Sequence, residues 1–270
     1  GAVLRQTGRV SESLVASKTS VQLAPQDAEA HSNFGNTLKE LGRLDEAEAS
    51  LRQAITLKPD FVKAHYNLGN TLQELVRLAE AETSYTQAIT LKPDYAEAHS
   101  NLGITLHELG KLEAAEASYK QAIALKPAYA EAYNNLGATL QELGRFEQAE
   151  ASLGQAIALK PDYAEAHKNL GITLKELGKF EQAEASLGQA IALKPDYAEA
   201  HINLLSCLYL LDKESLYFDK LDYLINEGTA NATIGSLTCR SALKYKVEKS
   251  NLFCREPLKY VSHIDMNTQY

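Results

Sequence analysis

The chain has 270 residues, of which 45% are apolar, enough to build a sizeable core, so wholesale disorder is excluded. Its 27 basic and 35 acidic residues give a net charge of −8 at pH 7, which argues against a nucleic-acid-binding protein because such proteins carry a clustered basic excess. The longest apolar stretch, residues 202–211, is far shorter than the roughly 20 residues that cross a bilayer. We therefore expect neither nucleic acid nor a membrane among the partners.

The three cysteines are too few, and odd in number, for a disulfide framework; they are Cys207, Cys239 and Cys254. No basic segment followed by an apolar one opens the chain, as a signal peptide would. These features predict a cytoplasmic protein with reduced thiols. The chain begins with Gly1 instead of methionine, as a processed or subcloned fragment would, and residues 2–25 align with residues 36–59. We therefore expect it to start inside an earlier copy of an internal repeat.

Prolines reveal that repeat. Six of the seven lie 34 residues apart, at positions 25, 59, 93, 127, 161 and 195. A period of this length is typical of stacked helical repeats. If position 1 of the repeat is Ala28, five full units occupy residues 28–61, 62–95, 96–129, 130–163 and 164–197, and residues 198–211 supply the first helix of a sixth. We therefore expect a partial repeat over 1–27 and a continuous array over 28–212.

Each unit is predicted to contain two helices. In the third unit, apolar residues follow a 3.6-residue period over 96–109 and again over 112–125. Gly110 is expected to end the first helix in the left-handed conformation, and Pro127 to end the second. Val76 stands where the other units have this glycine, so strain is expected there. Glycines at repeat position 8 should let the paired helices approach closely.

Helix starts carry a further signal. Asp94, Asp162 and Asp196 each stand three residues before a glutamate, which is the spacing of a capping box. We therefore expect these aspartates to cap the first helices.

The repeat is lost after Asp212. Residues 214–226 remain amphipathic and predict the second helix of the last unit, with further helices over 231–244 and from Pro257. Because a stacked repeat buries its apolar face only against a neighbour, we expect residues 213–270 to form a divergent helical cap.

The third unit resembles the tetratricopeptide repeat, through Leu102, Gly103, Leu106, Ala115, Tyr119, Ala122 and Pro127. The resemblance runs in register over about residues 25–212. It implies an all-α fold: a right-handed superhelical solenoid of antiparallel helix pairs whose first helices line a concave groove. It also implies that repeat positions 2, 5, 9, 12 and 13 face this groove.

Repeat position 6 is always asparagine: Asn33, Asn67, Asn101, Asn135, Asn169 and Asn203. A carboxamide offers one acceptor and two donors, which complement a peptide group. First helices about 8–10 Å apart would place one asparagine at roughly every third residue of an extended chain. This is similar to the asparagine ladder in the repeat arm of O-linked N-acetylglucosamine transferases. The alternative is recent duplication, since the threonine at position 10 is equally constant.

The units 130–163 and 164–197 differ at 5 of 34 positions, four of them on the first helix. Drift at exposed positions explains this, and so does a groove adapted to a ligand. Besides the asparagine ladder, the predicted peptide-contact residues are Asn70, His107, Gln141, Lys168 and Lys175. His107 is expected to stand alone in the groove.

Charge suggests the kind of segment that would bind. Residues 28–212 contain 16 basic and 26 acidic residues, and glutamates recur at positions 2 and 13. Such a surface should attract a neutral to basic extended segment of a protein or peptide. Position 5 holds a single lysine, Lys168, so the resemblance does not extend to the family's carboxylate-clamp subclass.

No residue pattern predicts catalysis, a metal or a cofactor. The histidines at position 4 recur once per unit, about 10 Å apart by helix spacing, which is too far for one zinc ion; we expect them to fill the seam between first helices. His263 and Asp265 match part of an iron-binding triad, but no second histidine follows. Phosphate loops, nucleophile elbows and paired Cys-x-x-Cys motifs are missing.

Three functional hypotheses follow. The first is a non-catalytic scaffold that binds an extended peptide or partner protein in the groove. The second is the substrate-docking arm of a larger enzyme, glycosyltransferase-like or 2-oxoglutarate oxygenase-like, whose catalytic domain lies outside this sequence. The third is a structural protein that self-assembles through its repeat ends or its C-terminal tail.

Overall fold

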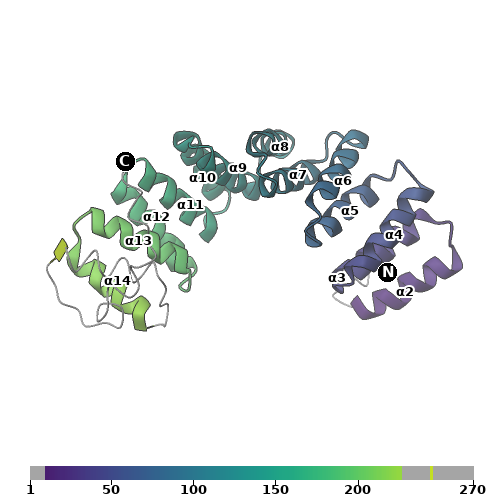
Figure 1. The fold of residues 1–270 in the computed structure, drawn as a ribbon, viewed down its shortest axis with the longest axis horizontal. Helices are drawn as coiled ribbons and strands as arrows, with labels where there is room; N and C mark the ends of the chain where they lie inside the picture. Colours follow the sequence, from purple (N-terminus) through teal and green to yellow (C-terminus); the bar gives the residue numbers. More distant parts are fainter. Residues whose placement is uncertain (1–9, 227–243, 246–270) are drawn as a thin grey trace, which may run out of the picture. The chain divides into compact units, whose positions relative to one another are not determined.

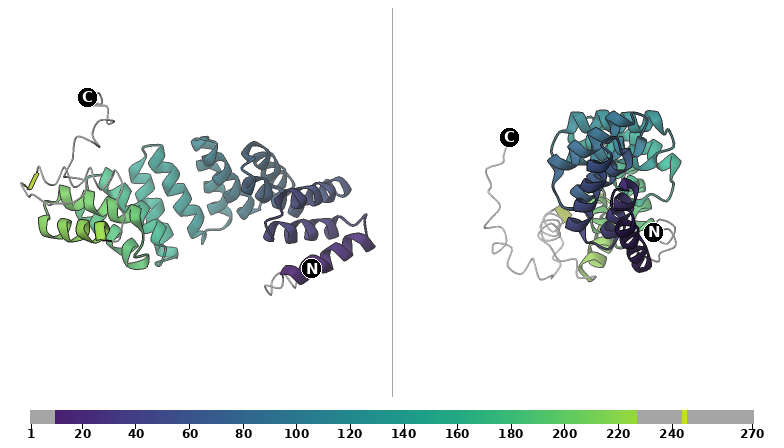
Figure 2. Two further views of the ribbon diagram at one scale, coloured as in Figure 1. Left: turned by 60° about the horizontal axis from the view of Figure 1, so that its bottom comes forward. Right: turned by 90° about the vertical axis from the view of Figure 1, so that its right-hand side faces the viewer.

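The computed structural model describes residues 10–226 and 244–245. Within these residues the chain forms 13 α-helices and no strand, so the predicted all-α repeat of helix pairs is confirmed (Figures 1 and 2). The first helices of the repeats are α3 (Ala28–Glu40), α5 (Val62–Glu74), α7 (Ala96–Glu108), α9 (Ala130–Glu142), α11 (Ala164–Glu176) and α13 (Ala198–Leu210). The second helices are α2 (Val10–Leu23), α4 (Leu44–Leu57), α6 (Leu78–Leu91), α8 (Leu112–Leu125), α10 (Phe146–Leu159), α12 (Phe180–Leu193) and α14 (Glu214–Asn226).

The chain divides into two compact parts, Gly1–Leu143 and Gly144–Tyr270, each of which contains several repeat units. In the first part, each helix from α2 to α9 packs against the next one in the chain, and the same holds from α10 to α14 in the second part. The first helices α3, α5, α7, α11 and α13 therefore each lie between two second helices, and α9 packs against α8. None of the helices between residues 10 and 226 combines the length and the apolar character needed to cross a bilayer.

The paired helices approach closely because small residues line their contact. A Cβ added to Gly69 would lie 2.6 Å from the ring of Tyr85, and one on Gly171 would lie 2.5 Å from Leu187 Cγ. Alanines at repeat positions 3, 20 and 27 are buried throughout, as at Ala64, Ala81 and Ala88. The predicted role of the position-8 glycines is confirmed at Gly35, Gly69, Gly103 and Gly171.

The turn between the two helices requires a left-handed residue. Gly42, Gly110, Gly144 and Gly178 have φ of 70–72°, and Val76 has φ of 59° at the equivalent place. The next residue then bonds back to the first helix, as Lys111 N–H does to Leu106 O at 2.9 Å. Because a β-branched residue rarely adopts positive φ, the strain expected at Val76 is confirmed.

The capping boxes expected at Asp94, Asp162 and Asp196 are wrong. The residues that precede α7, α11 and α13 are Tyr95, Tyr163 and Tyr197, none with a side-chain cap. Each aspartate lies one residue too early, because the tyrosine takes the cap position. The centroid of the tyrosine ring lies 4.7–5.0 Å from Nζ of the lysine three residues earlier. Among α3 to α13 only α3 has a side-chain cap, Asp27 Oδ1, which accepts from Glu29 N–H at 2.9 Å.

The position-4 histidines fasten the loop between units. Nε2 of each one donates to the carbonyl of the proline six residues earlier, at 2.8–3.0 Å, in His31, His65, His99, His167 and His201. This bond ties the end of one unit to the first helix of the next. The repeated proline and histidine are therefore one structural device.

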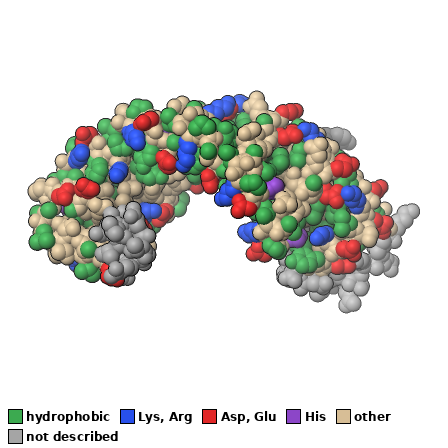
Figure 3. All heavy atoms as spheres, turned by 180° about the vertical axis from the view of Figure 1, so that it is seen from behind, with side chains coloured by type: hydrophobic (Ala, Val, Ile, Leu, Met, Phe, Trp, Pro, Cys, Tyr) green, Lys and Arg blue, Asp and Glu red, His purple; other side chains and the backbone are tan. Residues whose placement is uncertain are grey.

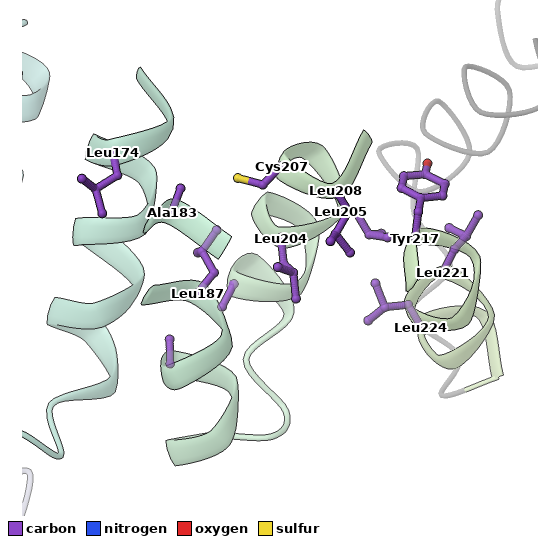
Figure 4. Packing of buried hydrophobic residues seen from close by; sticks show 12 residues of the cluster. Leu174, Ala183, Leu187, Leu204, Leu205, Cys207, Leu208, Tyr217, Leu221 and Leu224 are labelled. Carbon is purple, nitrogen blue, oxygen red and sulfur yellow. The ribbon is translucent and has the colours of Figure 1, made fainter. Parts of the chain in front are cut away.

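The last helix pair departs from the repeat. The helix predicted over 214–226 is confirmed as α14. Leu205 replaces the position-8 glycine, and Tyr217 and Leu224 replace the position-20 and position-27 alanines. These larger side chains fill one buried cluster between α12, α13 and α14, shown in Figure 4.

Two residues of the C-terminal tail join that end of the stack. Tyr245 packs against the cluster, with its ring centroid 5.7 Å from that of Phe218, and Lys244 Nζ lies 2.7 Å from Asp212 Oδ1. Cys207 is buried, as expected. Cys239, Cys254, His263, Asp265 and the helix expected from Pro257 lie outside the described residues, as does almost all of 231–244.

Val76→Gly should stabilise the protein by about 0.5–1 kcal/mol. A left-handed backbone costs a non-glycine residue roughly 1–2 kcal/mol, and this cost is removed by the substitution. Part of the gain is offset because glycine has more conformational freedom in the unfolded chain. Val76 is 77% exposed, so little packing is lost. Urea unfolding followed by circular dichroism would measure the change. Gly110→Val is the reverse control and should destabilise; a lower midpoint for Val76→Gly would contradict the assignment of strain.

Gly154→Ala and Gly188→Ala should each stabilise by roughly 1 kcal/mol, because glycine is a poor residue inside a helix. A Cβ at either position, in α10 or α12, meets nothing within 4 Å. Gly171→Ala in α11 is the matched control and should destabilise. Thermal unfolding of the three variants would rank them, and a destabilised Gly154→Ala would show that this glycine has a packing role.

Candidate functional site

One side of every first helix turns away from its second helix. Position 8 faces the second helix, and at 100° per residue positions 2, 6, 9 and 13 fall 100–160° away from it, whereas position 12 lies about 40° from it, between this side and the second helix. The glutamates at position 13 are exposed, while positions 6, 9 and 12 are nearly all partly exposed. We call these five positions the first-helix face. In Gly1–Leu143 this face lies on α3, α5, α7 and α9, and in Gly144–Tyr270 the corresponding face lies on α11 and α13.

The predicted asparagines lie on this face. Asn33, Asn67, Asn101, Asn135 and Asn203 are partly exposed, whereas Asn169 is buried, with 5% of its surface accessible. The threonines at position 10 are fully buried, and each hydroxyl donates to the backbone carbonyl of the asparagine four residues earlier, at 2.8–3.0 Å. The threonine is therefore constant for a structural reason, its bond to the backbone carbonyl of the asparagine. This bond does not explain why the asparagine side chain is constant.

Two of the asparagines are tied to neighbours on the face. Asn101 Nδ2 donates to Tyr66 Oη at 3.1 Å and to Asn70 Oδ1 at 2.9 Å. Asn203 Nδ2 donates to Glu199 O at 2.9 Å, and its Oδ1 accepts from Lys175 Nζ at 2.9 Å. These side chains are therefore oriented before any ligand arrives.

A buried tyrosine extends the first of these networks. Tyr85, on α6, is fully buried, and its single hydroxyl hydrogen is shared between Asn70 Oδ1 at 2.7 Å and Gln73 Oε1 at 3.0 Å. Sequence analysis missed Tyr66, Gln73 and Tyr85. The sequence did contain a signal for Tyr85, because only the unit 62–95 has both a tyrosine at position 24 and an asparagine, Asn70, at position 9.

Tyr66 also forms an aromatic pair on the α5–α7 part of the face. Its ring centroid lies 4.8 Å from that of Tyr95 and 6.0 Å from that of Tyr85. Burial raises the pKa of Tyr66 and the pKa of Tyr85 above the ordinary value for tyrosine, and it raises the pKa of Tyr95 to about 12. The three hydroxyls are therefore protonated at neutral pH and act as neutral hydrogen-bonding groups.

His107 does not stand alone, contrary to the sequence-based expectation. Its Nε2 lies 2.9 Å from Glu142 Oε1 on α9, although without hydrogen-bonding geometry. Lys39 and Glu74 occupy the equivalent positions on α3 and α5 and form an ion pair at 2.9 Å. Position 12 of one unit thus meets position 13 of the next, a contact that a single helix pattern does not reveal. Gln141, also at position 12, is partly exposed on α9.

Lys168 lies partly buried beside the next first helix. Its Nζ donates to Glu199 Oε2 at 3.0 Å and lies 5.6 Å from the centroid of the Tyr197 ring. Burial lowers the pKa of this ammonium, but the hydrogen bond to Glu199 and the nearby charges outweigh burial, so its pKa is raised. The expectation that position 5 faces the groove is wrong for Ser32, Ser100 and Asn134, which are buried because this position lies at the contact with the neighbouring helix.

A second series of ion pairs follows the other side of the repeat and was missed at the sequence level. The cation at position 16 contacts the glutamate at position 21 of the preceding unit, at 2.5–2.7 Å; the pairs are Arg77–Glu48, Lys111–Glu82, Lys179–Glu150 and Lys213–Glu184. One face of the molecule shows acidic and basic side chains interspersed (Figure 3). Each exposed pair is worth roughly 0–1 kcal/mol.

The described residues offer little else for small-molecule chemistry. Among residues 10–226 and 244–245, no three His, Cys, Asp or Glu side chains are close enough to hold a metal ion. A hollow of about 170 Å³ lies on the first-helix side beside Asn33, between α2 and α3, and is lined by Ser17, Ser20 and Asp27. A larger hollow of about 460 Å³ opens among α4, α5 and α6, where Ile55, Leu68 and Gln87 line it.

Two family models match the sequence. One, described as TPR repeat, matches residues 35–76, 77–110 and 105–144, and the other, described as tetratricopeptide repeat, matches residues 129–196. Together they cover more than half of the chain. No curated protein matches the sequence significantly.

Solved repeat proteins have a similar structure. YrrB, described as a TPR protein with an unusual peptide-binding site, is 25% identical, with a TM-score of 0.60 over 68% of this chain and 95% of its own. PilF of Pseudomonas aeruginosa is 16% identical, with a TM-score of 0.69 over 79% and 97%. PilW, a type IV pilus biogenesis factor, is 21% identical, with a TM-score of 0.69 over 78% and 98%. The last two similarities concern the fold alone.

Proposed function

Because the chain belongs to the tetratricopeptide repeat family, whose members are generally protein–protein interaction scaffolds, we propose that its first-helix face binds an extended segment of a partner protein. The observation that carries this proposal is the contrast between positions 6 and 10. The threonines are buried and bond the helix backbone, whereas five of the six asparagines stay partly exposed on the first-helix face of their own part of the chain. The peptide-binding site described for YrrB supports the same use of the fold.

The asparagines would hold the backbone of the segment and the variable positions would select its side chains. A neutral carboxamide bonds a peptide group whatever the sequence of the ligand. Lys168, Lys175, His107 and Gln141 differ from unit to unit and lie beside the asparagines in the repeat. The exposed glutamates at positions 2 and 13 favour a neutral to basic segment, even though Glu74, Glu142 and Glu199 each have a cationic or histidine neighbour. The chain itself is proposed to act as a scaffold without catalysis.

Replacing Asn67, Asn101 and Asn135 together with alanine should weaken peptide binding by about 2–4 kcal/mol, because each neutral hydrogen bond contributes roughly 0.5–1.5 kcal/mol. This corresponds to a loss of tens- to several-hundred-fold in affinity. Peptides selected from a random 12-residue display library, measured by fluorescence anisotropy, would report the loss. It should be similar for peptides of unrelated sequence.

The matched control is the triple variant Gln53→Ala, Gln87→Ala and Gln121→Ala, which removes three exposed carboxamides from the second helices. It should bind as the unchanged protein does. Thermal midpoints must be measured for both triple variants, since alanine is the better helix former. If the asparagine variant folds and binds every peptide normally, the face is not the binding surface.

We also propose that residues 213–270 close the array, with α14 as the covering helix. Leu204, Leu208 and Leu221 are buried in the cluster between α12 and α14, and Tyr245 packs on its edge. Because stacked repeats depend on their neighbours, an end without this cover would fray.

Deletion of residues 213–270 should therefore increase hydrogen exchange in α13 first and then in α12, since the cover of Leu204 and Leu208 is lost. Helices α3 to α5 provide the internal control and should keep their protection. Unchanged protection across 164–211 would show that the tail does not close the array.

A further inference from the structure

We propose that Asn70 and Asn101 form a clamp for one backbone peptide group of the bound segment, and that buried Tyr85 is the positioning residue that orients this clamp. The proposal deepens the function proposed above and rests on it. It assigns a specific task to the unit 62–95, which differs from its neighbours in the side chains beneath the first-helix face.

The two carboxamides are bonded head to tail. Both hydrogens of Asn101 Nδ2 are committed, one to Asn70 Oδ1 at 2.9 Å and one to Tyr66 Oη at 3.1 Å. Asn101 therefore has its Oδ1 to offer as an acceptor. Asn70 Oδ1 already accepts from Asn101 and from Tyr85, so Asn70 can offer a donor on Nδ2, even with one of its two hydrogens turned to Tyr66.

One donor and one acceptor on adjacent first helices match a peptide group, which has one N–H and one carbonyl. The match holds if both amides are turned the other way, because head-to-tail bonding always leaves one end of each kind facing outward. The clamp thus differs from a plain ladder. At this place Asn101 supplies one half of the contact and Asn70 supplies the other half.

The neighbouring units provide an internal comparison for the role of Tyr85. Asn36 occupies the position of Asn70 in the unit 28–61, where Leu51 replaces the tyrosine, and Asn36 Oδ1 is buried without a hydrogen-bond partner among the described residues. The unit 96–129 has Tyr119 at the tyrosine position but Ile104 at the asparagine position, so its hydroxyl has no such amide to orient.

The surroundings favour neutral backbone over a charged side chain. Tyr66 and Tyr95 are partly exposed, and their ring centroids lie 4.8 Å apart with the ring planes tilted by 40°, which gives an aromatic surface beside the clamp. Of the carboxylates that act on these tyrosines, Glu97 is paired with Lys126 at 3.3 Å and Glu74 with Lys39 at 2.9 Å, and Glu108 is a further carboxylate near Tyr85. The network consists of Tyr66, Asn70, Gln73, Tyr85 and Asn101, and all five side chains are uncharged at neutral pH.

The test compares Tyr85→Phe with Tyr119→Phe, two removals of a hydroxyl at the same repeat position. The probe is a 12-residue peptide of alternating serine and alanine, blocked at both ends, titrated into the ¹⁵N-labelled protein. Tyr85 is fully buried, so a loss of binding in Tyr85→Phe must act through the amides above it. We expect affinity to fall about 3- to 10-fold in Tyr85→Phe, the loss for one neutral hydrogen bond, and to change less than about 2-fold in Tyr119→Phe.

A second readout needs no ligand. In the free protein, the side-chain NH₂ signals of Asn70 and Asn101 should shift in Tyr85→Phe and stay in place in Tyr119→Phe. A purely structural role for the tyrosine would not move these signals selectively.

The outcomes separate the two proposals. Equal binding by Tyr85→Phe and the unchanged protein overturns the clamp and leaves peptide binding intact. Equal weakening in both phenylalanine variants also overturns the clamp, because the hydroxyl then acts through general stability. If the peptide shifts no signal from the first-helix face of the unchanged protein, peptide binding fails and the clamp fails with it.

Discussion

The contact between the position-8 glycine and the large position-24 side chain sets the geometry of each repeat. With no Cβ at Gly69, the ring of Tyr85 passes beneath α5, and any larger residue at position 69 would meet that ring at 2.6 Å. The contact fixes which side of the first helix is buried and therefore which side faces away from the second helix. It also brings the Tyr85 hydroxyl under Asn70, so a packing requirement becomes a means of orienting a side chain on the face.

The recurring proline and histidine add a second constraint, between units instead of within them. Because His65 Nε2 bonds the carbonyl of Pro59, the loop that ends one unit is fastened to the first helix of the next. Ion pairs at positions 12 and 13 and at positions 16 and 21 also join successive units. Individually these exposed pairs contribute little to stability. They recur at the same repeat positions, whereas the exposure of the position-6 asparagines varies: five are partly exposed and Asn169 is buried.

Sequence periodicity was sufficient to predict the helices. The glycines and prolines recur at fixed places, so the bounds of α3 to α13 follow from local backbone chemistry. The caps were predicted wrongly because Asp94 lies one residue too far from the helix, and a tyrosine that stacks with a lysine takes the cap position. That choice depends on side-chain packing that no spacing rule contains.

The side-chain network could not be predicted for a related reason. Asn70, Tyr85 and Asn101 come from α5, α6 and α7, and their contact depends on how three helices pack. His107 meets Glu142 through the same kind of contact between neighbouring first helices. Periodicity places each residue on its own helix face; it does not say which residues of adjacent helices touch.

The most direct test of the account is to locate a bound peptide. A spin-labelled peptide selected from the display library would broaden the amide signals of nearby residues in the labelled protein. The account predicts broadening at positions 6 and 9 of the first helices, including Asn67, Asn70 and Asn101. Broadening confined to the second helices, around Ile55 and Gln87 at the hollow among α4, α5 and α6, would contradict it.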